Sequence, residues 1–407
     1  MYYIDAQTQD YILFFLGVLA FVIYGMSMFF IMVSHFGVFC HFYKKTNSLV
    51  LDDSLPGVSI IKPLMGIDPL LQENLESHFT LNYPKFELLL CVPDDQDPAI
   101  KLVLHLKEKY PDVDCKLFTG GKKGIINPMV YNMAPGYENA KYKYVWISTS
   151  RIKASTDIIL DLVNKLQPPN VALVHQMPFT TDAKGFAATV EKIYFGCCLA
   201  RYYVAFNMLG QCCATGMSYM FKKAMLDEVN GLIYYGKYLA EDYFLTSALH
   251  EKGHKLVVSA IPAQQNVAAS SVKAYKDRMV RWLRLRLNMM PIVSGILEPL
   301  GDVFPLGIWI GWSFYHFFGI SPYYVFTFHV VSMILLDYIQ LRMVQNGPVL
   351  FSFAEFLAAW FFRELLTIIV YIEAILQPRT IEWGGRTYLV KYGGLTTIVD
   401  RSKKALS

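Results

Sequence analysis

The chain has 407 residues, of which 54% are hydrophobic and only 17% are charged, and its formal net charge is +4. This composition is too apolar for an ordinary soluble enzyme and favours a protein that lies in a membrane. The small net charge excludes the broad basic surface that nucleic-acid binding needs, so we expect no nucleic-acid partner.

The first predicted element is a membrane-spanning helix over residues 11–34, which contain no charged side chain. A helix of this length extends roughly 36 Å, enough to cross the hydrocarbon core of a bilayer. Asp5 and Asp10 precede the helix, whereas Lys44 and Lys45 follow it. Because basic residues favour the cytosolic side, the chain after the helix is expected to face the cytosol.

Residues 1–34 thus form a predicted anchor and residues 35–56 a linker, after which short β-rich runs alternate with amphipathic helical runs. Examples are the strand-like "GVSIIKPL" and "FELLLCV" and the helix-like "LLQENLESHFTLN" between them. This alternation predicts an α/β domain over residues 57–286, with a mostly parallel sheet flanked by helices.

Polar side chains gather at the predicted carboxyl edge of this sheet, where open sheets of this kind bind their ligands. Lys62, Asp94 and Thr149 lie at or just after the ends of predicted strands. The acids around Asp94 suit a sugar, a nucleotide base or a metal ion, although Asp97 before Pro98 is typical of a helix start. We therefore assign Asp97 to a helix cap and leave Asp94 as a candidate binding residue.

Two acids, Glu241 and Asp242, precede a predicted helix in "LAEDYFLTSALHEKG". An aspartate at such a position commonly caps the helix and interacts with its dipole. The same carboxylate can serve as a general base where a positive site for a departing anion lies near it. Both readings stay open on these residues alone.

Four arginines follow in "DRMVRWLRLRLNMM", before a long apolar stretch. Arg278 and Arg281 are three residues apart and share a helix face, with Trp282 next to them, which suits a diphosphate clamp with an aromatic floor. Arg284 and Arg286 lie among apolar neighbours and fit a basic membrane interface.

The predicted domain ends at residue 286, and residues 287–378 contain three further apolar stretches. We expect several C-terminal transmembrane helices there, interrupted by prolines and by charged residues, with the number of spans left open. The glycine-rich residues 379–407 are expected to form a polar tail.

Segments spread over nearly the whole chain resemble the ceramide glucosyltransferase family of membrane-bound, inverting glycosyltransferases. They include "KPLMGIDPLL", "GFAATVEKIYFG", "YLAEDYF", "RMVRW" and "DYIQLR", in that order. The resemblance implies a GT-A catalytic domain that uses UDP-glucose as donor and ceramide as acceptor. It also implies a multi-pass Golgi membrane protein with its catalytic domain facing the cytosol, and leaves open whether the chain forms a homo-oligomer.

The family has three separated aspartates followed by a Q/R-x-x-R-W motif. The resemblance places Asp94 at the donor nucleotide and makes Asp242 the catalytic base, and the last motif is complete at Arg278–Trp282. Thr149 stands where the family has its second aspartate, which helps to hold a divalent ion on the diphosphate. A neutral hydroxyl cannot replace that negative ligand, so binding of Mg²⁺ or Mn²⁺ is expected to be impaired and the metal ligands stay unassigned.

Two smaller departures from the family are Met129, where a lysine is usual, and Leu199, where a histidine is common. With Thr149, they keep open a weakened or non-catalytic paralogue that binds ceramide as an alternative to transfer of glucose to ceramide. A second alternative, which does not depend on these positions, is a glycosyltransferase that acts on another membrane lipid.

The predicted mechanism needs one base and a positive site. Asp242 would take the proton of the incoming hydroxyl, while Arg278 and Arg281 would stabilise the departing diphosphate. A single displacement from the face opposite the leaving group would invert an α-linked donor to a β-glucoside.

Overall fold

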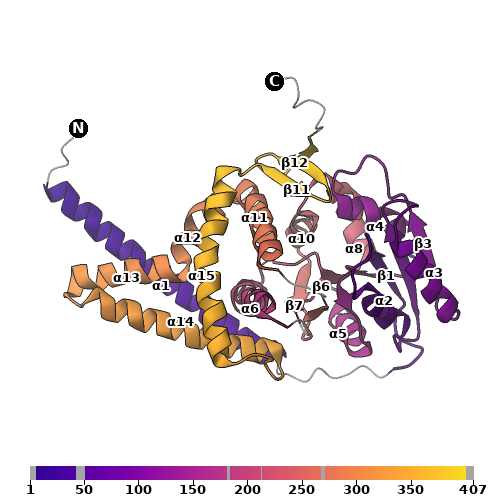
Figure 1. Cartoon of the computed structure of the whole chain (residues 1–407), viewed down its shortest axis with the longest axis horizontal. Coiled ribbons are helices and arrows are strands. Elements are labelled where there is room, and N and C mark those ends of the chain that lie inside the picture. The colour runs from indigo at the N-terminus through magenta and orange to yellow at the C-terminus, as the bar shows by residue number, and fades with distance from the viewer. Residues whose placement is uncertain (1–5, 43–50, 181–183, 212, 267–270, 400–407) are drawn as a thin grey trace.

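The computed structural model describes most of the chain, namely residues 6–42, 51–180, 184–211, 213–266 and 271–399. An α/β domain lies on one side, and long apolar helices extend from it on the other (Figure 1). Lys44 and Lys45, on which the predicted orientation depends, lie outside the described residues.

The core of the α/β domain is a seven-stranded sheet in the order β3-β2-β1-β4-β8-β6-β9. Only β8 runs antiparallel to its neighbours, so the predicted mostly parallel sheet is confirmed. Strands with both faces covered by helices are mostly apolar, as β1 and β2 are here. The strands are β1 (Val58–Pro63), β2 (Phe86–Val92), β3 (Cys115–Thr119), β4 (Tyr144–Ser148), β6 (Val171–His175), β8 (Ser218–Lys222) and β9 (Lys255–Val258).

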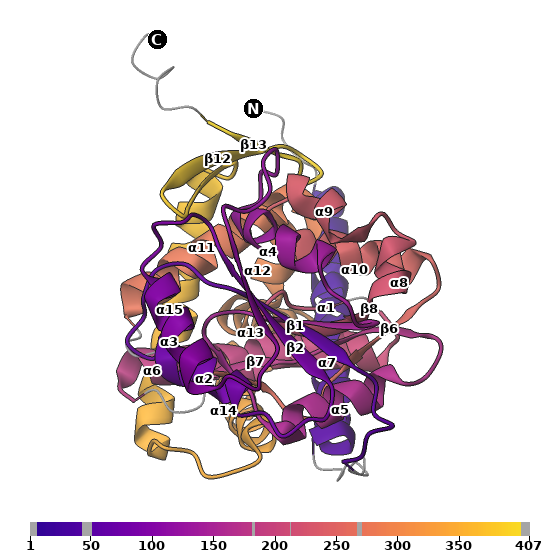
Figure 2. The same cartoon turned by 90° about the vertical axis from the view of Figure 1, so that its right-hand side faces the viewer.

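Helices cover both faces of this sheet (Figure 2). One face packs against α2 (Leu71–Phe79), α3 (Ala99–Lys109) and α5 (Thr156–Leu166). The other packs against α4 (Pro128–Glu138), α8 (Lys223–Asp227), α9 (Gly231–Tyr234) and α10 (Glu241–Glu251). Successive strand residues serve opposite faces: Ile60 belongs to the first core and Ile61 to the second.

A second, three-stranded sheet leads from this domain to the arginine-rich helix. Its order is β5-β10-β7, formed by β5 (Ile152–Lys153), β7 (Pro178–Thr180) and β10 (Ala263–Gln265). The arginines lie on α11 (Val272–Met289), which follows β10 in the chain. Because β10 pairs with β5, the turn after β4 is held close to the segment that precedes α11.

The apolar helices form a separate group. α1 (Ala6–Phe42) packs against α7 (Ala200–Met208), α13 (Val303–Phe318) and α14 (Pro322–Gln345). By length and composition α1 and α14 could each cross a membrane. The short helices η3 (Val293–Leu297) and α12 (Glu298–Gly301) would form a third span with α13, bent by 66°.

One long helix, α15 (Phe353–Leu376), separates the two groups. It packs against α11 and α6 (Phe186–Ile193), and α6 continues through the π-helical η1 (Tyr194–Leu199) into α7. The predicted membrane region therefore holds fewer clear spans than its apolar stretches suggest. In α15 the Arg363–Glu364 ion pair is buried, and such charges count against a lipid-facing span.

The expectation of a polar tail after residue 379 was wrong for most of that segment. Three strands form an antiparallel sheet there: β11 (Thr380–Trp383), β12 (Arg386–Val390) and β13 (Thr396–Ile398). Gly384 and Gly385 have φ values of 57° and 73°, which a two-residue hairpin turn requires. The glycines that suggested a loop thus connect two strands, and the sheet buries Ile381 and Tyr388 against Leu239.

Candidate functional site

Asp94 and Thr149 follow β2 and β4, two parallel strands that lie on either side of β1. At the usual strand spacing, their positions are roughly 10 Å apart along the carboxyl edge of the sheet. Asp94 is exposed, and its Oδ1 accepts a hydrogen bond of 2.9 Å from the amide of Gln96. Asp97 is buried and accepts from the amides of Gly66 and Ala99, so the predicted helix-start role of Asp97 is confirmed.

Asp242 lies in the first turn of α10, yet it does not cap that helix in the usual way. The N-cap is Ala240, which has no capping side chain, and Oδ1 of Asp242 accepts a 2.9 Å hydrogen bond from the amide of Tyr243 in the same turn. The Oδ2 atom of Asp242 accepts from the amide of Gly216 at 2.7 Å. Burial raises the pKa of the Asp242 carboxyl, which makes its conjugate base a better proton acceptor near neutral pH.

The contact between Asp242 and Gly216 requires a glycine, because the main chain at Gly216 lies very close to the carboxylate. A Cβ atom at Gly216 would lie 2.9 Å from Oδ2 of Asp242, so a side chain at that position would displace the carboxylate. The adjacent Met217 accepts, through its carbonyl, a 3.1 Å hydrogen bond from the amide of Thr149. One short segment, 216–217, therefore ties the candidate base to the turn that carries the altered family position.

Glu241, next to the candidate base, is a buried acid held by Asn127. Its Oε2 accepts from the side-chain amide of Asn127 at 2.5 Å. Burial, with a further contribution from Asp242, raises the pKa of Glu241 to about 8. Asn127 also caps α4 through the amide of Met129 at 2.8 Å. Met129 itself packs on the adjacent core. This altered family position therefore lies next to Asn127, which holds Glu241.

Lys62 is fully buried behind the turn after β4. Its amine donates to the carbonyls of Thr149 at 2.9 Å and Ile152 at 3.0 Å. Nε2 of His78 lies 3.4 Å from the same amine and 2.9 Å from the hydroxyl of Ser148. Burial lowers the pKa of Lys62 well below its usual value. Lys62 thus fixes the shape of the turn, and its predicted direct contact with substrate stays a prediction.

The two arginines of the predicted clamp have different surroundings. Arg278 forms an ion pair with Glu191 of α6, and its guanidinium lies 5.8 Å from the Trp282 ring centroid. Arg281 lies over the ring of Trp383, 5.3 Å from its centroid. Trp282 thus contacts Arg278, the first arginine of the predicted motif. The aromatic partner of Arg281 is Trp383, which lies in the C-terminal sheet and was not predicted.

A third arginine, Arg151, joins them and was not among the predicted site residues. Its side chain is exposed, and its carbonyl accepts a 2.9 Å hydrogen bond from the amide of Asn266. Burial lowers the pKa of both Arg278 and Arg281, and the charge of Arg151 lowers the two pKa values further. The three guanidinia therefore form one positive cluster. In the sequence, the only indication that Arg151 belongs to the site was its charge, in "STSRI" after a predicted strand.

Arg284 and Arg286 are bound to protein groups. The guanidinium of Arg284 donates to the carbonyls of Thr380 at 2.9 Å and Glu373 at 3.0 Å. That of Arg286 donates to Glu298 at 2.7 Å. The role at a membrane surface that the sequence predicts for these two arginines stays a prediction. Leu199, the other altered family position, is half-buried where η1 meets α7.

The residues present do not fit a divalent cation. Among the residues that the structure describes, no group of three or more His, Cys, Asp or Glu side chains could hold a metal ion. Thr149 offers a neutral hydroxyl, which is a weaker ligand for a hard cation than a carboxylate oxygen. Two residues further on, Arg151 would repel such a cation.

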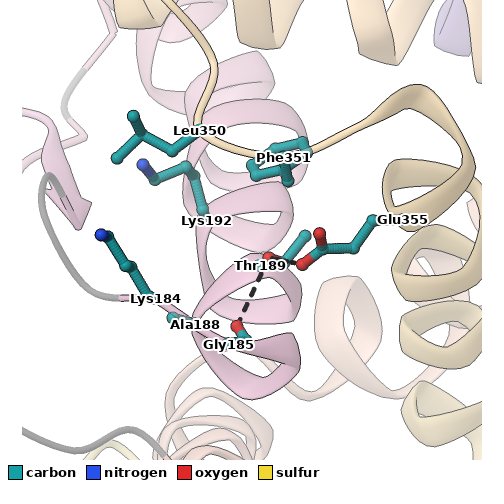
Figure 3. A pocket seen from close by; sticks show the side chains of 8 residues that line it. All are labelled: Lys184, Gly185, Ala188, Thr189, Lys192, Leu350, Phe351 and Glu355. Atoms are coloured by element: carbon teal, nitrogen blue, oxygen red, sulfur yellow. Dashed lines mark hydrogen bonds between the residues drawn. The ribbon is translucent and has the colours of Figure 1, made fainter.

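A separate pocket of about 190 Å³ lies between α6 and the segment that leads into α15 (Figure 3). Thr189 donates a 2.8 Å hydrogen bond to Oε1 of Glu355 across it. None of the predicted site residues lines it, so we treat it as distinct from the sheet edge. Its lining residues are Lys184, Gly185, Ala188, Thr189, Lys192, Leu350, Phe351 and Glu355.

Comparison with known proteins gives consistent relatives. Residues 20–396 match the description of glycosyl transferase family 21. Ceramide glucosyltransferase 3 of Caenorhabditis elegans is 41% identical over 353 residues, which cover 86% of this chain and 76% of that protein. Ceramide glucosyltransferase 1 of the same organism is 38% identical over 367 residues, covering 90% and 78%.

A solved structure supports the fold. Mannosyltransferase PcManGT from Pyrobaculum calidifontis, in complex with GDP-Man and Mn²⁺, aligns with a TM-score of 0.52 and 16% identity. The alignment covers 89% of this chain and 98% of that one. This likeness agrees with the expected GT-A type of fold.

Proposed function

Because the chain belongs to glycosyl transferase family 21, we propose that it transfers glucose from UDP-glucose to ceramide and releases glucosylceramide and UDP. This would be the first step of glycosphingolipid synthesis. The observation that carries the proposal is the partly buried Asp242, held by Gly216, in a domain that also presents the arginine cluster. A base and a positive site are what a glycosyl transfer from a nucleotide sugar requires.

The proposed reaction is a single displacement. Asp242 takes the proton of the acceptor's hydroxyl while that oxygen forms a bond to the anomeric carbon. The bond between this carbon and the diphosphate breaks, and its electron pair leaves with UDP. Arg278 and Arg281 stabilise the charge that develops on the leaving group. Attack opposite the diphosphate converts the α-linked donor into a β-glucoside.

The apolar helices support a lipid acceptor. α1 packs against α7, and α7 continues the same helix as α6 and η1, which contact α11 and α14. A lipid held by the membrane would therefore lie close to the helices that hold the arginines. We place the chain in the Golgi membrane, with the domain facing the cytosol. Protease added to sealed microsomes should then cleave within residues 45–270, and complete protection there would contradict this orientation.

The decisive experiment is product analysis of the full-length protein in lipid nanodiscs. Labelled UDP-glucose and a short-chain ceramide should give β-glucosylceramide, and the Asp242→Asn variant should give almost none. UDP-galactose and GDP-mannose should be poor donors. The proposal fails if no glycolipid forms while a curated relative produces it in the same assay.

A second candidate is a ceramide-binding protein with weak or absent turnover, favoured by Thr149 at the altered family position. It predicts that labelled ceramide binds to the protein while UDP-glucose is not consumed. Turnover with a diacylglycerol acceptor and none with ceramide would instead favour transfer to another membrane lipid.

A further inference from the structure

We propose that Arg151, together with Arg278 and Arg281, takes the place of a divalent cation at the donor diphosphate, so that this chain binds its nucleotide sugar without a metal ion. The inference rests on the proposed function, because it assumes that the ligand is a nucleoside diphosphate sugar. It adds a binding residue outside the Arg278–Trp282 motif and a metal-free mode of diphosphate recognition.

The first support is the rigid placement of the turn that carries Arg151. The Thr149 amide donates to Met217, and the Thr149 carbonyl accepts from Ile152 at 3.1 Å and from the buried amine of Lys62. The Arg151 carbonyl is bound to the amide of Asn266, at the end of β10. Hydrogen bonds on both sides of Arg151 therefore hold its main chain in place before any ligand arrives.

The second support is the balance of charge. Arg278 is paired with Glu191. By contrast, neither Arg151 nor Arg281 makes an ion pair or a side-chain hydrogen bond with any residue in the described ranges. Guanidinia that lack acidic partners are available to bind an anion, and the partly buried guanidinium of Arg281 gains most from such a partner. Two of them offer one cation for each ionised phosphate of a nucleotide sugar.

The third support is the ligand chemistry of the same turn. A divalent cation would need a carboxylate near Thr149, and it would be repelled by Arg151. A guanidinium placed there meets the diphosphate through hydrogen bonds as well as charge, because its planar fork can bind two phosphate oxygens at once. When the sugar bond breaks, the same contacts stabilise the extra negative charge on UDP.

The test measures nucleotide binding, so its result does not depend on transfer activity. Full-length protein in detergent micelles is titrated calorimetrically with UDP and with uridine, in EDTA and in Mn²⁺. We expect the affinity for UDP to differ by less than about threefold between the two conditions. Arg151→Gln should weaken UDP binding by about tenfold or more, and Arg151→Lys by less, with uridine binding unchanged.

Lys153→Gln provides a matched control on the next residue but one. Its amine is already paired with Glu73 at 2.6 Å, so removing this charge should leave UDP binding unchanged. Unaltered melting temperatures would show that all variants are folded. The proposal is overturned if EDTA abolishes binding of UDP to the wild type, or if Arg151→Gln behaves like Lys153→Gln.

A double variant tests the same idea in the opposite direction. Thr149→Asp combined with Arg151→Gly restores a carboxylate and removes the guanidinium, so UDP binding should now require Mn²⁺ and fall about tenfold or more in EDTA. Binding that is insensitive to EDTA in this variant would contradict the proposal. GDP is titrated in parallel. If GDP binds without metal and UDP does not, the donor assignment fails while the arginine inference stands. If neither binds, both fail.

Discussion

Charged side chains in the helical part of the molecule are paired with opposite charges, whereas two arginines at the edge of the sheet are not. Among the helices, Arg201 forms an ion pair with Asp337, whose second oxygen accepts a 2.8 Å hydrogen bond from the indole of Trp360. In the same region Arg363 is paired with its neighbour Glu364. Charge that is buried among apolar residues is tolerated when it is paired and hydrogen-bonded.

At the edge of the sheet, Arg151 and Arg281 have no such acidic partner within the part of the chain that the structure describes. The comparison teaches that the paired charges among the helices stabilise the fold, whereas Arg151 and Arg281, which lack an acidic partner, are available to bind a ligand. A paired charge should affect stability when it is removed, whereas an unpaired one should affect binding or turnover.

The largest effect should come from Asp337→Ala in the helical region. It leaves the guanidinium of Arg201 buried without its counterion and the indole of Trp360 without an acceptor. We expect the free energy of unfolding to fall by about 3–5 kcal/mol, measured by thermal unfolding in detergent. Glu138→Ala removes an exposed ion pair with Lys122 and should cost less than about 1 kcal/mol. Similar losses from both would contradict the comparison.

Asp242→Asn should be the most damaging change for turnover. Asparagine keeps the size of the side chain but cannot accept the acceptor's proton, so kcat should fall by about 100-fold or more. Binding of UDP should survive, because the carboxylate does not contact the diphosphate in the proposed reaction. The control is Asp277→Asn, on the exposed face of α11. Full activity of Asp242→Asn would exclude it as the base.

Arg281→Ala should cost about 2 kcal/mol of transition-state stabilisation, seen as a fall in kcat/KM at unchanged melting temperature. Arg284→Ala should do the reverse, because Arg284 binds the carbonyls of Thr380 and Glu373. The melting temperature should fall and kcat/KM should change little for the protein that remains folded. Equal losses of kcat/KM would remove the distinction between the two arginines.

On the acid side of its pH profile, kcat/KM should begin to fall at a higher pH than an ordinary aspartate would give. Burial raises the pKa of Asp242, and only its ionised form accepts a proton. Activity is therefore present above that raised pKa and is lost as the pH falls through it, by at most about tenfold per pH unit. A profile that stays flat down to the pKa of an ordinary aspartate, about 4, would contradict this prediction.

Trp383→Ala should have the smallest effect. It removes the ring beneath Arg281, a contact worth about 1 kcal/mol when partly exposed. We expect a fall of a few fold in kcat/KM and weaker binding of UDP. Trp383→Phe should recover part of the loss, since the ring face is retained. No recovery would indicate that packing, and not the attraction between ring and cation, is what matters.

Local pattern was enough to predict the sheet and its carboxyl edge. The strand that ends at Pro63 and the strand that precedes Asp94 are short, predominantly apolar runs, which is how strands covered on both faces appear in a sequence. The placement of Asp242 at the start of a helix followed from the same kind of evidence. Its role as base came from the family resemblance and stays a prediction.

The parts that were missed depend on tertiary contacts. Arg151 reaches the cluster because β5 pairs with β10, a pairing of two short strands more than a hundred residues apart. Lys62 looked like a residue at the open end of a strand, and nothing local shows that His78 and two carbonyls surround it. The alternating pattern around the two glycines of the C-terminal hairpin was a local signal that we read as a loop.

The C-terminal sheet also sets the order in which the site is completed during synthesis. Arg281 emerges from the ribosome well before Trp383, since α13, α14 and α15 lie between them in the chain. Domains fold as their residues appear, from the N-terminus onward. The α/β domain can therefore form while the ring that supports Arg281 is still missing, and that ring arrives only after the apolar helices have been made. The aromatic support of Arg281 is therefore the last part of the site to be completed.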